Sequence, residues 1–95
     1  MGKISSSPAI YNKTMTSANT EYSQELPAGT HKFLIKCRGS YAIKLCFVAE
    51  QSGTTYITIP ADRALLVDNL SLSGSKTLYF QCGTAAQVCE IMTWG

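Results

Sequence analysis

The feature of this sequence that most restricts its fold is a two-residue alternation of apolar and polar side chains in short segments. In HKFLIKC, residues 31–37, the side chains of Phe33, Ile35 and Cys37 fall on one face of an extended chain, and Leu34 falls on the other face with two lysines. No segment carries the apolar stripe at three- and four-residue spacing that a helix of ordinary length needs. The chain is therefore predicted to be all-β.

Turn residues divide the sequence into short strands. Hairpins are predicted from residues 31–37 with 41–49 and from residues 76–82 with 87–94. Further strands are predicted at 54–59, which ends at Pro60 because proline cannot donate to a ladder, and at 65–67 and 70–72. We expect at least six strands in a small antiparallel β-sandwich or jelly-roll-like barrel with an extended N-terminal arm. The predicted inner face contains Phe33, Ile35, Ile43, Leu45, Phe47, Leu78 and Phe80.

Residues 1–26 differ from the rest, because they are rich in Ser, Thr and Asn and show neither alternation nor a helical stripe. We expect two parts, an extended arm over residues 1–26 and a β-sandwich domain over residues 27–95. Two interpretations of the arm stay open. It is either a flexible tail or a segment that orders against a neighbouring subunit through isolated apolar residues. These residues are Ile4, Ile10, Tyr11, Met15 and Tyr22.

The size and surface of the chain favour association with other proteins. A chain of 95 residues has room for one core, and it buries only about 60–65% of its unfolded surface. Charged residues make up 15% of the chain, against an ordinary share of about 25%. The net charge of +2 is too small to indicate nucleic acid. No apolar run approaches the ~20 residues of a membrane helix, and no membrane partner is expected.

The four cysteines, Cys37, Cys46, Cys82 and Cys89, contain no C-x-x-C pair, and their spacing is unusual for zinc. Reduced thiols that act as small core residues are the favoured interpretation. A disulfide between Cys82 and Cys89, which flank a short turn, is the alternative.

No pattern of catalytic residues stands out. The single histidine, His31, has no second histidine for a metal site, and no serine lies in G-x-S-x-G. The six carboxylates are scattered, and nothing in the sequence brings two of them together as glycosidase chemistry requires. We expect no enzyme activity, no cofactor and no metal.

The one local group of charges is basic. Lys32, Lys36 and Lys44 are predicted to share the outward face of the first hairpin, with Arg38 at its tip. A solvated sheet face with lysines that block edge pairing is favoured. A protein partner is the second interpretation and a nucleic-acid backbone the third.

Four segments in order resemble a group of small virion proteins of tailed bacteriophages. They are EYSQELPAGTHKFLIKCRGSYAIKLCF, TTYITIPA, DNLSLSGSKTLYFQC and AAQVCEIMTW, which together span about Glu21 to Trp94. The group has an L-P-A-G turn before a β-domain, then a T-I-P-A turn, a D-x-L-x-L-S-G stretch and a tryptophan near the end. This sequence departs from the group at Asp62-Arg63 and in its four cysteines.

The resemblance implies a non-enzymatic structural protein located in the virion and assembled in the bacterial cytoplasm. A capsid decoration (cement) protein, present in many copies or as a homo-oligomer and bound to the major capsid protein or other virion proteins, is expected first. A neck, tail or baseplate component, or a receptor- or carbohydrate-binding fibre module, is the alternative. The leucine-rich stretch is expected to pack between sheets through Leu65, Leu66, Val67, Leu70 and Leu72. The residues expected to contact partners are Ile10, Tyr11, Met15, Tyr22, Lys32, Lys36, Lys44, Asp62 and Arg63.

Overall fold

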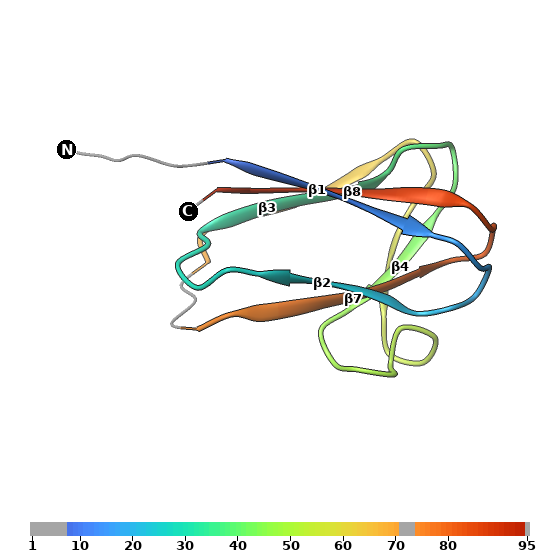
Figure 1. The fold of residues 1–95 in the computed structure, drawn as a ribbon, viewed down its shortest axis with the longest axis horizontal. Coiled ribbons are helices and arrows are strands. Elements are labelled where there is room, and N and C mark those ends of the chain that lie inside the picture. Colours follow the sequence, from blue (N-terminus) through green and yellow to red (C-terminus); the bar gives the residue numbers. More distant parts are fainter. Residues whose placement is uncertain (1–7, 71–73, 95) are drawn as a thin grey trace.

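The structure is a computed structural model that describes residues 8–70 and 74–94, and these form two antiparallel four-stranded sheets packed face to face (Figure 1). Sheet A has the strand order β1-β8-β3-β6 and sheet B the order β2-β7-β4-β5. The described residues contain no helix, and accordingly no helix that could cross a membrane. The strands are β1 (Ala9–Met15), β2 (Tyr22–Leu26), β3 (Lys32–Cys37), β4 (Ile43–Cys46), β5 (Ile57–Ile59), β6 (Ala64–Val67), β7 (Lys76–Cys82) and β8 (Gln87–Trp94).

The chain crosses between the sheets at almost every connection. Consecutive strands lie in opposite sheets, except β4 and β5, which pair with each other. This arrangement is a double-sheet jelly roll, so the predicted all-β sandwich is confirmed. Both predicted hairpins are wrong, because β3 and β4 lie in different sheets, as do β7 and β8. Alternation fixes which side chains face the core, but it is the same whether a strand pairs with its neighbour in sequence or crosses to the other sheet.

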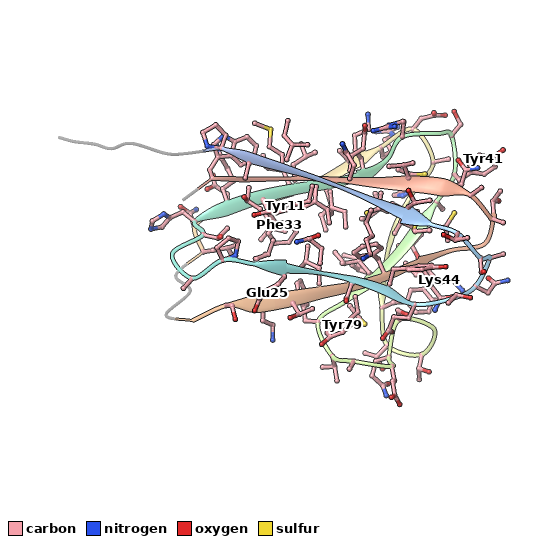
Figure 2. The ribbon with its side chains drawn as sticks, in the orientation of Figure 1. Tyr11, Glu25, Phe33, Tyr41, Lys44 and Tyr79 are labelled. Carbon is pink, nitrogen blue, oxygen red and sulfur yellow. The ribbon has the colours of Figure 1, made fainter. Side chains whose placement is uncertain are left out.

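The core lies between the two sheets and is made of alternate side chains from both. Six of the seven residues predicted for the inner face are buried, and Phe33 is seen between the layers in Figure 2. Phe47 is the exception, with 42% of its surface exposed. It was expected to continue the alternation of β4, but that strand ends at Cys46 and the chain turns outward. The hydrophobic core cluster contains Met15, Leu26, Phe33, Ile35, Cys37, Ile43, Leu45, Ile59, Leu78, Phe80, Cys82, Cys89 and Ile91.

The boundary predicted between arm and domain is wrong. Residues that were assigned to the arm form β1 and β2, which are edge strands of sheet A and sheet B. The side chains of Met15 and Leu26 are 0% and 1% exposed, so both belong to the core. An edge strand with an outward face in solvent needs few apolar residues, which explains why its sequence resembles a loose arm. Residues 1–7, including Ile4, lie outside the described residues.

The leucine-rich stretch packs only in part between the sheets. Leu65, Val67 and Leu70 are half-buried against the core cluster, but Leu66 points outward from β6 and is 53% exposed. The alternation within β6 makes this outcome unavoidable, because neighbouring residues of a strand face opposite sides. Leu72 lies outside the described residues.

All four cysteines are buried free thiols. Cys89 lies opposite Cys37 in the β8–β3 ladder, whereas Cys82 is in the other sheet. The idea that Cys82 and Cys89 are cross-strand neighbours is therefore wrong. Burial raises the pKa of the Cys89 and Cys37 thiols, as expected for thiols that serve as core residues.

Candidate interaction surfaces

The space between the sheets is filled mainly by apolar side chains, so the side chains that could act as catalysts or metal ligands lie mostly at the surface. His31 is exposed at the start of β3, and its backbone N–H and C=O bond to Trp94 and Leu70. Within residues 8–70 and 74–94, no group of three or more His, Cys, Asp or Glu side chains could hold a metal ion. The described residues instead form two exposed apolar surfaces.

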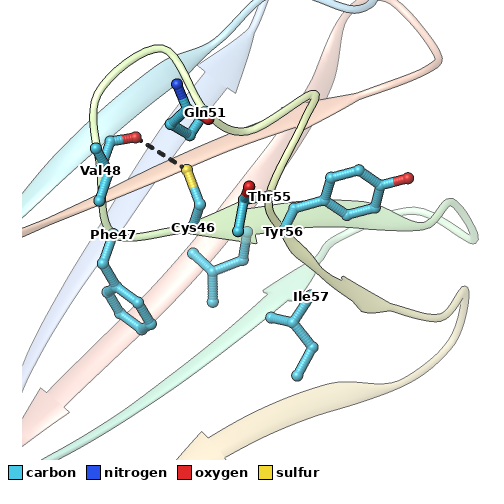
Figure 3. A pocket seen from close by; sticks show the side chains of 8 residues that line it. Cys46, Phe47, Val48, Gln51, Thr55, Tyr56 and Ile57 are labelled. Atoms are coloured by element: carbon cyan, nitrogen blue, oxygen red, sulfur yellow. Dashed lines mark hydrogen bonds between the residues drawn. The ribbon is translucent and has the colours of Figure 1, made fainter.

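The first surface is a hollow at one end of sheet B, where β4 and β5 are joined by the loop of residues 47–56. The hollow has a volume of about 500 Å³. Four of the seven large apolar side chains that are exposed among the described residues line it. They are Phe47, Val48, Tyr56 and Ile57, which are between 41% and 62% exposed. Figure 3 shows Phe47 and Ile57 at the sides of the hollow.

Internal contacts hold the loop of residues 47–56 in place. The carboxylate of Glu21 accepts hydrogen bonds from the backbone N–H of Glu50 (2.7 Å) and from the hydroxyl of Ser52 (2.6 Å). The Gln81 amide, on β7, donates to the same hydroxyl at 3.0 Å, and Ser52 is 1% exposed. The Cys46 thiol donates to the carbonyl of Val48 at 3.2 Å, as drawn in Figure 3. These contacts fix the backbone of the loop that forms one wall of the hollow.

These contacts favour the ionised form of Glu21. Desolvation raises the pKa of Glu21, but the hydrogen bonds from Ser52 and from the backbone of Glu50 together outweigh it and hold the pKa below its ordinary value. A charged acceptor makes stronger hydrogen bonds than a neutral one. The loop is consequently attached to the sandwich by a charge-assisted contact at neutral pH.

The second surface is the outer face of sheet A. Ile10 lies opposite Met92, Met92 opposite Leu34, and Leu34 opposite Leu66, in one line across β1, β8, β3 and β6. We call these four residues the apolar row. Ile10 and Leu66, at the two ends, are 66% and 53% exposed. A line of apolar side chains across a solvent-facing sheet is typical of an interaction site.

Charged and aromatic side chains flank the apolar row. On one side the ammonium of Lys32 lies 4.6 Å from the centre of the Trp94 ring. On the other side Glu90 accepts a hydrogen bond from Arg38 at 2.8 Å and lies 4.0 Å from the Lys36 ammonium. The outer face of sheet A thus combines an apolar centre with charges of both signs.

The structure separates the predicted partner-contact residues. The predicted basic cluster does not form, because Lys32 and Lys36 are on sheet A while Lys44 is on sheet B beside Tyr56. Met15 is fully buried, so its prediction as a contact residue is wrong. The remaining predicted residues are Ile10, which is exposed, Tyr11 and Tyr22, which pack against the core, and Asp62 and Arg63, which are exposed at a corner where Ser40 bonds Asp62.

The prediction missed most of both surfaces. Leu34 was placed on the outward face of its strand, but the sequence gives no sign that it lies beside Met92 and Leu66, because that depends on pairing between distant strands. Phe47 was missed because it was assigned to the core. The available signal was the Glu50 to Gly53 turn, which shows that the chain leaves the sheet near this point.

Comparisons with known proteins agree with the architecture. No family model matches the chain, and no match was found among curated proteins. Among solved structures, the chain is similar to a de novo designed double-stranded β-helix whose structure was determined by solution NMR. The match has 12% sequence identity and a TM-score of 0.57, and it covers 94% of this chain and 99% of that one. This similarity shows the fold alone: the chain is a double-stranded β-helix, or jelly roll.

Proposed function

We propose that this chain is a non-enzymatic structural protein of a tailed-bacteriophage virion, most specifically a capsid decoration protein that binds the major capsid protein. The observation that carries the proposal is the ordered hollow lined by Phe47, Val48, Tyr56 and Ile57. The sequence resemblance to small virion proteins names the class of partner. The hollow and the resemblance together support a protein that attaches to a larger assembly.

The hollow has the properties of a protein-binding site. Aromatic and aliphatic side chains in a concave, preformed site are the usual anchors of protein interfaces. Because Glu21 and Gln81 already hold the loop, binding does not have to pay the conformational entropy of ordering it. Lys76, whose ammonium lies 5.9 Å from the centre of the Phe47 ring, adds a positive charge beside the hollow.

A carbohydrate- or receptor-binding module is the second candidate, because the same hollow exposes two aromatic rings, Phe47 and Tyr56. Sugars stack on a free aromatic face. One face of Tyr56 is occupied by Lys44, whose ammonium is 4.9 Å from the ring centre. This contact favours a protein partner over a sugar.

Mass spectrometry of purified virions, with the copy number of this chain measured against the major capsid protein, tests the proposal. Hundreds of copies per particle are expected for a decoration protein, whereas about six or twelve would indicate the neck or tail, as cyclic symmetry of those structures requires. Absence of the chain from the particle would contradict a virion role. Binding of the purified chain to a glycan array would support the second candidate.

A further inference from the structure

Strands β8 and β3 carry complementary side chains at matching positions on the outer face of sheet A. Their pairing places Met92 opposite Leu34, Glu90 opposite Lys36 and Trp94 opposite Lys32. The alternate residues of both strands, among them Phe33, Ile35 and Ile91, face the core. On the outer face, β8 therefore presents an acidic, an apolar and an aromatic side chain in a column. The neighbouring column on β3 presents a basic, an apolar and a basic side chain at the same three levels.

From this arrangement we propose that the outer face of sheet A binds a second copy of the chain in a two-fold symmetric dimer. The two-fold axis lies in the plane between the two faces, parallel to the strands and above the space between β8 and β3. Rotation by half a turn about this axis lays β8 of one copy over β3 of the other at the same level. A face whose two halves are complementary about such an axis satisfies the requirement of an isologous interface.

At the centre of this dimer, Met92 contacts the partner's Leu34. On one side of that contact Glu90 faces the partner's Lys36, and on the other side Trp94 faces the partner's Lys32. Each of these contacts occurs twice. Within one chain, the Glu90 carboxylate and Lys36 ammonium are already 4.0 Å apart, so dimerisation joins two exposed ion pairs into one network.

The ends of the apolar row also match. Ile10 on β1 comes to lie over the partner's Leu66 on β6, and these are the two most exposed residues of the row. Beside Ile10 there is a shallow hollow of about 190 Å³, which Met92 and Leu34 also line. The partner's Leu66 projects toward it. Face-to-face sheets cross at about −30°, so the match is closest at the centre of the row and looser at its ends.

The area of the face is that of a weak dimer. The four strands have seven, eight, six and four residues, and with a spacing of about 4.8 Å and a rise of about 3.3 Å per residue they cover roughly 400 Å² in projection. Two such faces together bury roughly 800 Å², which is below the standard size of a stable interface and in the range of weak, transient ones. The hollow lined by Phe47 is built from sheet B and its loop, so it stays open in the dimer and the inference does not depend on the proposed function.

Sedimentation equilibrium of the full chain, from about 5 to about 500 µM, tests the dimer over the range where an interface of this size associates. The chain is expected to sediment as a monomer–dimer mixture. Leu66→Glu should weaken dimerisation at least about tenfold, because it places two charges in the apolar row. Leu66 is half exposed in the monomer, so the melting temperature of the Leu66→Glu variant should differ little from that of the wild type. Glu25→Lys, an exposed change on sheet B, is the control and should leave association unaltered.

A charge exchange tests the orientation of the two copies. Glu90→Lys alone sets its new lysine against the partner's Lys36, and Lys36→Glu alone sets two carboxylates against each other, so each variant should be more monomeric than the wild type. A mixture of the two variants restores opposite charges at both contacts and should form heterodimers. Wild-type chain that is monomeric at every concentration, Leu66→Glu that dimerises like wild type, or a mixture that associates no better than either variant would each overturn the proposal.

Discussion

The carboxylate of Glu21 joins two parts of the molecule that are far apart in sequence. It precedes β2 and accepts hydrogen bonds from Glu50 and Ser52, within the loop that forms one wall of the hollow. No sequence pattern could predict this contact, because it depends on the fold bringing residue 21 beside residues 50–52. In the sequence Glu21 is only one of six scattered carboxylates.

Replacing Glu21 by Gln should therefore lower the free energy of unfolding at pH 7 by about 1 kcal/mol, through loss of charge-assisted hydrogen bonds. The folded pKa of Glu21 lies below its ordinary value of 4.5. Its contribution is thus complete above that pH and is lost as the pH falls through the folded pKa. Urea unfolding at pH 7 and at about pH 3 measures the difference between wild type and variant, which should shrink in acid.

Glu25→Gln is the matched control, because Glu25 is exposed on β2. It should unfold like wild type at both pH values. A Glu21→Gln variant whose deficit is equally large at low pH would show that the ionised carboxylate is not what holds the loop.

At the scale of elements, strands were predicted well where one face is clearly apolar and the other clearly polar. The segments 76–82 and 87–94 were predicted with the bounds that β7 and β8 have. β1 was missed because only its two ends and Tyr11 face inward with apolar side chains, while Asn12, Lys13 and Thr14 are exposed. Partner strands were mispredicted because register and sheet membership are set by contacts between distant residues.

Removing residues 1–15 should unfold the domain, because it deletes β1, uncovers the edge of β8 and removes Met15 from the core. Met15→Ala should by itself cost about 2–5 kcal/mol, the usual effect of truncating a buried Met. Chemical denaturation followed by circular dichroism measures both. Thr14→Ala, an exposed change on the same strand, should have little effect. A truncated chain that still unfolds cooperatively at the wild-type midpoint would mean that β1 is a dispensable arm.

At the scale of the whole molecule, the candidate binding surfaces of the jelly roll lie on its outside. The sheets pack directly on each other through residues such as Phe33 and Phe80, so the interior of the described fold holds no ligand site. The sequence was sufficient to predict an all-β sandwich and most of the inward-facing residues of β3, β4 and β7. It was insufficient for both surfaces, because the apolar row exists only through strand pairing and the hollow only through the outward turn after Cys46.

Incorporation of variants into particles tests the central claim, that the hollow attaches this chain to a larger assembly. Under the proposed virion role, phages that lack the wild-type gene are supplied with either Phe47→Asp or the control Glu25→Lys, and the copies per particle are counted by mass spectrometry. Phe47 is 42% exposed, so the aspartate should leave the fold intact, which circular dichroism checks. The account predicts at least about a tenfold loss of copies for Phe47→Asp, as expected when a central anchor is removed, and wild-type numbers for Glu25→Lys. Equal incorporation of the two variants would contradict it.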